Sequence, residues 1–218
     1  MSQNEKKKRA ALAALEFIED GMTLGVGTGT TVDHFIGALA AHSHRLQSVV
    51  SSSDRSTTRL RELGIEVTDM AAVGDIDLYV DGADEATKRL ELIKGGGGAL
   101  TREKILAGAA RRFICIIDDS KLVGQLGRFP LPVEVLPIAR AFVSRQLLKA
   151  GGQPIWREQF VTDNGNHIVD VHDLRISNPA ELETRINQIP GVVTVGLFVH
   201  RRPDVLLVAS DTEVRTMR

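Results

Sequence analysis

Four side chains that could transfer protons lie in one short stretch of the chain, DGADEATKRLELIKGGGGALTRE. They are the carboxylates of Asp81, Asp84 and Glu103 and the ammonium of Lys94, which is followed directly by four glycines. A carboxylate can remove a proton from a carbon next to a carbonyl, and a lysine with backbone N–H donors can hold the enediolate oxygen that results. The stretch therefore points to proton transfer at such a carbon.

The elements around this stretch would place the four groups at one edge of an α/β sheet. Residues 75–80, DIDLYV, are mostly apolar and rich in β-branched and aromatic side chains, which predicts a buried strand. Asp81 and Asp84 follow its carboxyl end, where open α/β sheets bind ligands. The glycines after Lys94 have no Cβ atoms, so their N–H groups can approach a ligand closely. Taken singly, each aspartate could instead be a turn former.

Residues 99–111 are predicted to form a helix that carries Glu103 in its first or second turn. The apolar face of this helix would consist of Ala99, Leu100, Ile105, Leu106 and Ala109. The helix dipole stabilises an anion near the helix start by about 0.3–1 kcal/mol, whereas burial would raise the pKa of the carboxyl group toward that of a useful base. The alternative is that Glu103 only suits the helix start and pairs with Lys104 or Arg102.

A second candidate site lies in residues 22–39, MTLGVGTGTTVDHFIGAL, which predict a strand, a glycine-rich turn and a helix. Thr28, Gly29, Thr30 and Thr31 lie at the turn, where the N–H groups of a helix N-terminus and hydroxyl donors can bind a phosphate. Neither the G-x-G-x-x-G fingerprint nor a Walker A loop fits the sequence. The turn therefore favours a small phosphorylated metabolite over a nucleotide. The alternative is a tight turn with a threonine cap.

The composition is that of a soluble globular protein, with 218 residues of which 43% are hydrophobic and 25% are charged. A formal net charge of −1 gives no electrostatic field for nucleic acid or membrane. The one cysteine, Cys115, lies in the apolar run FICII and is expected in a buried strand, so no disulfide framework is expected. No apolar signal core or membrane-spanning stretch occurs, and we expect a cytoplasmic protein.

The order of predicted elements indicates two domains. The predicted elements of the first are a helix at residues 4–19 and strands at 22–26, 46–50, 76–80 and 112–117. This alternation builds a Rossmann-like parallel sheet with helices on both faces, and the apolar run DVLLVAS near the C-terminus is expected to rejoin it. We therefore expect a Rossmann-like catalytic domain formed by residues 1–130 plus 204–218. Residues 131–203 follow the order β-α-β-β-α-β of a smaller, inserted α+β ferredoxin-like domain, expected to act as a lid or dimerisation domain.

Two other kinds of chemistry fit the sequence less well. A metal site formed by Asp81, Asp84 and Glu103 is conceivable, but the ammonium of Lys94 would repel a cation, and no H-E-x-x-H motif or cysteine cluster occurs. A serine nucleophile lacks the G-x-S-x-G motif, and residues 51–54 predict a strand-end loop and a helix cap instead. We expect neither a metal nor a cofactor.

Several long motifs resemble one enzyme family. VGVGTGTT, SSSD, YVDGADE, IKGGGGALTREK and FPLPVEV have the order and spacing found in ribose-5-phosphate isomerases of the A type, and the similarity continues through VTDNGN and IPGVVTVGLF. The resemblance covers nearly the whole chain. It implies the reversible isomerisation of D-ribose 5-phosphate and D-ribulose 5-phosphate in the non-oxidative pentose phosphate pathway. It also implies catalysis without a cofactor by a homodimer or a dimer of dimers.

The resemblance further implies a role for each candidate site residue. Glu103 would be the general base that moves a proton between C1 and C2 through an enediolate. Asp81 would assist ring opening and hydroxyl proton transfer with Asp84 close by, while Lys94 would polarise the carbonyl. The positions implied to bind the substrate are Lys7, Thr28, Gly29, Thr30, Thr31, Gly82, Ala83, Gly95, Gly96, Gly97 and Lys121. The family often has serine where this chain has Thr30, which keeps a hydroxyl donor.

Rival functions remain on the same scaffold. An aminosugar-phosphate deaminase would need a histidine beside a carboxylate, and the KGGGGALTRE region contains no histidine. A CoA transferase would use a glutamate as nucleophile toward an acyl group. A non-catalytic sugar-phosphate sensor would normally carry a DNA-reading helix-turn-helix, and no basic domain precedes the first predicted helix.

Overall fold

The computed structural model describes residues 1–218 and divides by its internal contacts into two units. Unit 1 consists of Met1–Gly82, Arg102–Leu122 and Pro203–Arg218, and unit 2 of Ala83–Thr101 and Val123–Arg202. These bounds differ from the predicted domains, because residues 83–101 and 123–130 group with unit 2 and Pro203 groups with unit 1. No helix is both long enough and apolar enough to span a membrane.

Unit 1 is built on a six-stranded sheet. In spatial order its strands are β13 (Val214–Met217), β12 (Val205–Ala209), β6 (Ala110–Asp118), β3 (Ile76–Asp81), β1 (Thr23–Val26) and β2 (Ser48–Ser51). All neighbouring pairs are parallel except β12 and β13. The predicted Rossmann-like sheet is therefore confirmed, with β12 rejoining it beside β6. The polar edge strand β13 has no apolar run and was not predicted.

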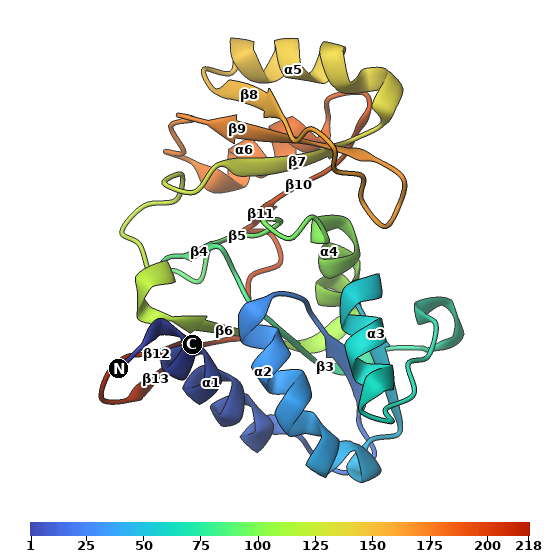
Figure 1. Cartoon of the computed structure of the whole chain (residues 1–218). Coiled ribbons are helices and arrows are strands. Elements are labelled where there is room, and N and C mark those ends of the chain that lie inside the picture. The colour runs from blue at the N-terminus through green and yellow to red at the C-terminus, as the bar shows by residue number, and fades with distance from the viewer. The chain divides into compact units, whose positions relative to one another are not determined.

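Helices cover both faces of this sheet. They are α1 (Gln3–Ala14), α2 (Thr30–Leu39), α3 (Asp54–Glu62) and residues 102–109 of α4 (Leu100–Ala109). Apolar side chains of α1 and α2 share one core with inward-facing residues of β1, β3, β6 and β12, and Figure 1 shows these two helices side by side. On the other face, Leu106 of α4 approaches Gly25 of β1. Ile105, predicted to belong to the apolar face of this helix, is instead 52% exposed.

Local sequence signals explain where the helices of unit 1 begin. Ser2 and Glu5 form a capping box at the start of α1, in which each side chain accepts a hydrogen bond from the other residue's backbone. Ser53 caps α3 by accepting a hydrogen bond from the Ser56 N–H, as predicted. The short 3-10 segments of the chain are η1 (Leu15–Phe17), η2 (Ala40–Arg45), η3 (Met70–Ala72), η4 (Asp119–Lys121) and η5 (Pro137–Ala139).

Strand β1 pairs with β2 on one side and β3 on the other, so the strand order reverses between β1 and β3. Ligands of open α/β sheets bind outside the carboxyl ends of the strands at such a reversal. The turn after β1 and the end of β3 at Asp81 lie at this point. The fold therefore places both predicted site regions of unit 1 where the sheet favours binding.

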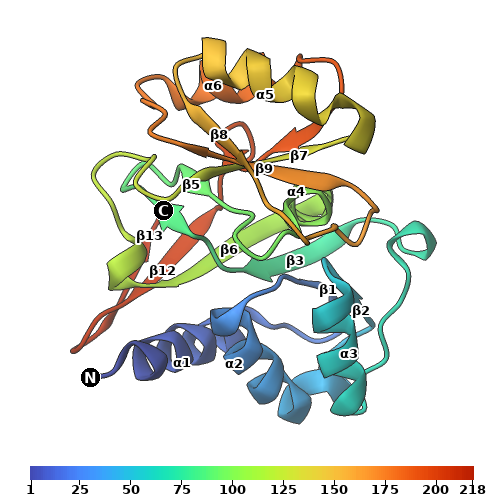
Figure 2. The ribbon, with the colours of Figure 1, turned by 45° about the horizontal axis from the view of Figure 1, so that its top comes forward.

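Unit 2 contains the predicted β-α-β-β-α-β arrangement. Its elements are β7 (Leu131–Val135), α5 (Arg140–Lys149), β8 (Gln153–Trp156), β9 (His167–His172), α6 (Pro179–Asn187) and β10 (Val192–Val195). The sheet order is β10-β7-β9-β8 with all pairs antiparallel. Residues of α5 and α6 share one apolar core with this sheet, so both helices cover the same face (Figure 2). The ferredoxin-like prediction is thus confirmed.

A three-stranded sheet explains why residues 83–101 group with unit 2. It has the order β11 (Leu197–Phe198), β5 (Leu92–Ile93) and β4 (Glu85–Ala86), and β11 follows directly after β10. The buried carboxylate of Glu85 also accepts hydrogen bonds from the N–H groups of Gly127 (2.8 Å) and Phe129 (2.7 Å). Strands of two residues carry no periodicity, so the sequence could not predict them.

Candidate active site

Asp81 is the centre of the site residues in unit 1. Its Oδ1 accepts hydrogen bonds from the N–H groups of Gly82 (2.7 Å) and Thr28 (3.1 Å), and its Oδ2 accepts one from the Tyr79 hydroxyl. A Cβ atom on Gly27 would lie 2.0 Å from Asp81 Cγ. Because a real Cβ cannot approach so closely, the turn after β1 requires glycine there. The carboxylate of Asp81 is therefore fixed against the predicted phosphate-binding turn.

Tyr79 is the side-chain partner of Asp81 within strand β3. The phenol is fully buried, and its ring packs against Phe113 with 5.1 Å between centroids. Burial, followed by the charges of the Asp81 and Glu103 carboxylates, raises the pKa of the Tyr79 hydroxyl well above its ordinary value. The hydroxyl therefore stays protonated and donates to Asp81. The sequence analysis did not select Tyr79, although its position two residues before a strand-end aspartate places both side chains on one face of β3.

Glu103 lies in the first turn of α4, as predicted, and only 3% of the residue is exposed. A carboxylate buried to this degree is unusual for an ordinary helix start. The alternative, in which Glu103 suits the helix start and pairs with Lys104 or Arg102, does not by itself require such burial. The charge of Glu103 is one of the causes that raise the pKa of Tyr79, the residue that donates to Asp81.

The turn after β1 has the features of an anion site. Gly29 has a φ of +107° and is the N-cap of α2, and no side chain caps this helix, so the predicted alternative of a threonine cap is wrong. The Lys7 ammonium of α1 donates a hydrogen bond to Thr30 Oγ1 at 2.9 Å, and Thr28 Oγ1 accepts one from the Ser53 hydroxyl at 3.0 Å. Uncapped N–H groups, hydroxyls and a lysine thus meet at one turn.

Charges around this turn are arranged so that an anion is not repelled. The carboxylate of Asp33, in the first turn of α2, is paired with Arg55 at 2.5 Å and Arg59 at 3.0 Å. Lys121 lies in η4, directly after β6, and is half-buried. The same segment contacts α1, because Lys6 pairs with Asp119 at 3.0 Å.

In unit 2, Asp84 is bound to the glycine run. Its Oδ2 accepts a hydrogen bond from the Gly96 N–H at 2.8 Å, and a Cβ on Gly96 would lie 2.5 Å from Asp84 Oδ1. The Gly98 N–H donates to the Gly95 carbonyl at 2.9 Å, and these two residues have φ values of +82° and +108°. The Gly96 N–H, one of the donors predicted to face a ligand, thus donates to the Asp84 carboxylate.

Lys94 is buried at the start of the glycine run, with 2% of the residue exposed. Its backbone N–H donates to the Gly196 carbonyl at 2.8 Å, and its ammonium lies 5.6 Å from the centre of the Phe198 ring. A Cβ on Gly196 would lie 2.3 Å from the Lys94 carbonyl oxygen, so only glycine permits this approach. The segment from β10 to β11 thus fixes the lysine from a distant part of the sequence.

Two further residues of unit 2 hold this region and were missed by the sequence analysis. Arg157 Nη1 donates hydrogen bonds to the carbonyls of Gly95 (3.2 Å) and Gly96 (3.1 Å). Glu134 is completely buried in β7 and accepts a hydrogen bond from Thr101 Oγ1 in α4 at 2.5 Å. A glutamate inside the apolar run LPVEVL was the one signal that could have drawn attention to it, since such residues are rarely buried without partners.

Glu134 also fixes the loop between β8 and β9. Its Oε1 accepts hydrogen bonds from Thr162 Oγ1 (2.9 Å), Asn166 Nδ2 (2.9 Å) and Asn164 Nδ2 (3.2 Å). These donors are neutral, and together they surround one buried charge. The VTDNGN motif is therefore explained by its hydrogen bonds to Glu134.

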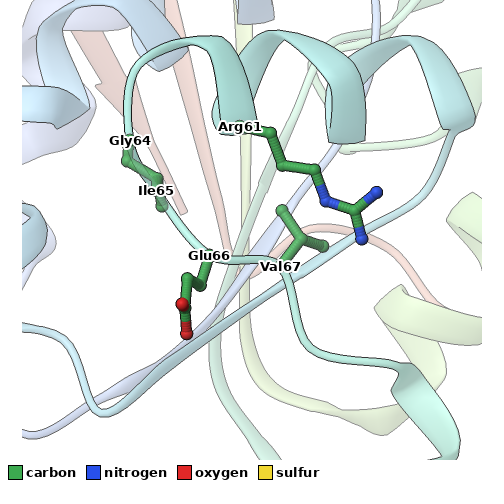
Figure 3. A pocket seen from close by; sticks show the side chains of 5 residues that line it. All are labelled: Arg61, Gly64, Ile65, Glu66 and Val67. Atoms are coloured by element: carbon green, nitrogen blue, oxygen red, sulfur yellow. The ribbon is translucent and has the colours of Figure 1, made fainter.

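Two surface cavities lie apart from these residues. One, of about 510 Å³, is lined by Arg61, Gly64, Ile65, Glu66 and Val67 at the end of α3. Figure 3 shows its Arg61 and Glu66 side chains pointing in different directions, so they form no shared binding group. The other, of about 170 Å³, is lined by Arg175, Ser177, Asn178, Glu181, Leu182 and Arg185. No predicted site residue lines either cavity. No group of three or more acidic, histidine or cysteine side chains is placed to hold a metal ion.

Comparisons with known proteins show the family of the chain. Residues 48–213 match the family described as ribose 5-phosphate isomerase A (phosphoriboisomerase A). A protein of Stenotrophomonas maltophilia (strain R551-3), ribose-5-phosphate isomerase A, is 57% identical over 212 residues, which cover 97% of this chain and 99% of that protein.

Solved structures with the same fold are similarly close. The crystal structure of ribose 5-phosphate isomerase A from Neisseria gonorrhoeae has 43% sequence identity and a TM-score of 0.97, covering 99% of this chain and 97% of that one. A D-ribose-5-phosphate isomerase in complex with phospho-erythronic acid has 36% identity and a TM-score of 0.96, with both chains covered completely. The chain therefore belongs to the ribose 5-phosphate isomerase A family.

Proposed function

We propose that this protein interconverts D-ribose 5-phosphate and D-ribulose 5-phosphate by aldose–ketose isomerisation through an enediolate. Family membership over the whole length supports the substrate and the reaction. The observation that carries the mechanism is a buried glutamate, Glu103, on the helix that follows the glycine run. A buried carboxylate in a phosphate-binding α/β fold is suited to removing a proton from carbon.

Glu103 is the general base of this proposal. In the aldose-to-ketose direction it removes the proton from C2, and the electron pair of that C–H bond forms the C1–C2 double bond of the enediolate. It then returns the proton to C1, while the hydroxyl proton at O2 moves to O1. No net oxidation occurs, because C1 is reduced as C2 is oxidised.

The other site residues have supporting roles. Asp81 assists ring opening and the transfer of the hydroxyl proton, a role supported by its fixed position among N–H and O–H donors. Lys94 polarises the carbonyl and stabilises the enediolate oxygen, together with N–H groups of the glycine run. Asp84 contributes through the Gly96 N–H that it binds.

The turn at Thr28, Gly29, Thr30 and Thr31 binds the 5-phosphate, together with Lys7 and Lys121. The uncapped N-terminus of α2 and the contact between Lys7 and Thr30 support this assignment. The remaining substrate contacts come from Gly82, Ala83 and the glycines Gly95, Gly96 and Gly97, which follow from the family motifs.

The test is ribulose 5-phosphate formation from ribose 5-phosphate by the purified protein with excess EDTA, beside Glu103→Gln. The variant keeps the shape of the side chain but cannot accept a proton, so its kcat should fall by about 10²–10⁴-fold with KM little changed. Turnover that survives the chelator and is lost in the variant supports the proposal. A variant with near-normal kcat would remove Glu103 from the role of base.

Other outcomes identify the rivals. Saturable binding of ribose 5-phosphate without turnover would indicate a sugar-phosphate sensor. Activity that disappears only with EDTA would mean that the carboxylates act through a metal ion. Neither result is compatible with metal-free isomerisation by Glu103.

We also propose that the protein is cytoplasmic and acts as a homodimer, with unit 2 contributing to the dimer contact or serving as a lid. Unit 2 exposes large apolar side chains on and around α5 and the edge strand β8, namely Leu136, Ile138, Phe142, Leu148, Ile155 and Trp156. Sedimentation equilibrium of the wild type and of Ile138→Asp would test the dimer contact. A variant that dimerises as tightly as the wild type would exclude this surface.

A further inference from the structure

Arg157 directly follows β8, and its guanidinium is held in an ion pair with a carboxylate. Its Nε and Nη2 donate to the two carboxylate oxygens of Asp170 on β9, at 2.8 and 2.5 Å. Its backbone N–H is bound to the Ile168 carbonyl at 2.9 Å. Both side chains of the pair are less than one-fifth exposed. A bidentate pair of this kind fixes the plane of the guanidinium and the direction of its remaining N–H groups.

The remaining nitrogen, Nη1, binds two successive carbonyls of the glycine run. It lies 3.2 Å from the Gly95 oxygen and 3.1 Å from the Gly96 oxygen. Phe160, from the same loop, packs so closely on Gly98 that a Cβ there would lie 2.1 Å from the ring, and the Arg157 guanidinium lies 5.3 Å from the ring centre. The loop after β8 therefore holds the glycine run, although the two segments lie about sixty residues apart in the sequence.

The geometry of the peptide bond determines where the N–H groups next to these carbonyls point. A trans peptide is planar, and its C=O and N–H point to opposite sides; no peptide of this chain is cis. With the Gly95 oxygen held by Arg157, the Gly96 N–H must point the other way, and there it donates to Asp84. With the Gly96 oxygen also held by Arg157, the Gly97 N–H must likewise point away from the guanidinium. Gly97 is an exposed residue, so a ligand can approach it.

We propose that Arg157 is a positioning residue for the isomerisation, which holds the Gly95 and Gly96 carbonyls so that the Gly97 N–H is directed at the substrate oxygen that becomes negative in the enediolate. This inference rests on the proposed function and adds a residue to it. Arg157 does not touch the substrate. It acts through the backbone, because a donor fixed in advance stabilises developing charge without reorganisation.

The first test compares Arg157→Met with Arg157→Lys and with the control Arg140→Met. Arg140 belongs to the same unit, but its guanidinium lies over the Trp156 ring at 3.7 Å and is not among the groups that bind the glycine run. We expect kcat of Arg157→Met to fall by at least about 10-fold, since loss of a well-placed donor costs up to about 10²–10³-fold, with KM nearly unchanged. Arg157→Lys should lie between it and the wild type. Arg140→Met should match the wild type.

A second readout separates positioning from general stability. Inorganic phosphate tests only the phosphate turn, whereas the carboxylate of phospho-erythronic acid mimics the charged oxygens of the enediolate. We expect Arg157→Met to weaken inhibition by phospho-erythronic acid by about 10-fold and to leave inhibition by phosphate unchanged. Asp170→Asn keeps Arg157 but weakens its bidentate pair. This variant should also weaken inhibition by phospho-erythronic acid, by a smaller factor, and leave inhibition by phosphate unchanged.

Three results would overturn the inference. They are a normal kcat in both Arg157 variants, equal weakening of both inhibitors, and an Arg140→Met variant as impaired as Arg157→Met. If Arg157→Met does not fold, Arg157→Lys and Asp170→Asn decide the matter by the same criteria. A wild-type protein without any turnover would overturn the proposed function itself, and this inference with it.

Discussion

Asp81 in unit 1 and the glycine run in unit 2 are held in contrasting ways. The carboxylate of Asp81 is bound by Tyr79 of its own strand, by the next residue, and by the turn after the neighbouring strand β1. The glycine run is bound by Arg157 and Asp84, and the backbone N–H of Lys94 just before it is bound by Gly196, about a hundred residues away. The strand-end carboxylate is thus held by its own strand and the adjoining turn, whereas the loop without side chains is held largely by contacts from elsewhere in the chain.

The largest loss of catalytic rate is expected from Gly27→Ala, which tests the difference between the Asp81 region and the glycine run. The new Cβ would collide with the fixed carboxylate of Asp81, which we propose to take part in catalysis, and a displacement of about 1 Å at such a group can cost about 10²-fold in rate. The control Gly37→Ala has no atom within 4 Å of its new Cβ, lies in a helix and should be fully active. Gly98→Ala in unit 2 meets only the end of the Phe160 ring, which can move, so its rate loss should be smaller despite the strained φ. Steady-state kinetics of the three variants would check this, and equal losses in Gly27→Ala and Gly98→Ala would break the comparison.

A stability effect is expected for Glu134→Ala in unit 2. The substitution leaves the donors of Thr101, Thr162 and Asn166 without their acceptor, and buried donors left unsatisfied cost about 1–3 kcal/mol each. We expect the free energy of unfolding to fall by at least about 2 kcal/mol, measured by urea denaturation. The control Glu158→Ala removes an exposed carboxylate of the same unit and should change it by less than about 0.5 kcal/mol. Equal stability of the two variants would show that the Glu134 network does not hold the loop.

A smaller effect on binding is expected for Lys7→Met in unit 1. Loss of the ammonium beside Thr30 should raise KM for ribose 5-phosphate by about 10-fold, which corresponds to about 1.4 kcal/mol, and leave kcat unchanged. Lys8→Met is the matched control, because Lys8 is exposed one position along the same helix. An unchanged KM in Lys7→Met would remove Lys7 from the phosphate site.

The smallest effect concerns Tyr79, the single tyrosine of the chain. Its pKa is raised in the folded state, so above about pH 10 the unfolded state loses a proton that the folded state keeps. The free energy of unfolding should therefore fall as the pH rises in this range, and Tyr79 should account for up to about 1.4 kcal/mol of this fall per pH unit. Tyr79→Phe should remove that contribution to the pH dependence. Urea denaturation of both proteins between about pH 9 and 11 measures the difference. Identical slopes would contradict a raised pKa.

The sequence predicted those parts of the fold and site that depend on local patterns. Strand β3 and its terminal aspartate were predictable because an apolar run ended at a turn, and the β-α-β-β-α-β order followed from alternating periodicities. The role of Glu103 came from a family motif, and its burial agrees with the expected role.

Features that arise only from tertiary contacts were not predictable. Arg157 looks like any charged residue after a strand, and nothing in its neighbours indicates that it binds Gly95 and Gly96. The hydrogen bond from the Gly96 N–H to the Asp84 carboxylate was likewise not foreseen, because the two residues lie twelve positions apart. The small sheet depends on such a contact too, because β5 pairs with β11 about a hundred positions away.

The position of β12 has a consequence for the growing chain. Between the synthesis of β6 and β12, the ribosome must add residues 119–204, which takes about 4–17 s at about 5–20 residues per second. Until β12 emerges, the apolar strand β6 is the outermost strand of the sheet that can form, and one of its edges lacks a partner. The β-α-β-β-α-β segment of unit 2 is complete before that edge is covered. An exposed edge strand invites pairing with other chains, so this interval is when the nascent protein is most exposed to aggregation.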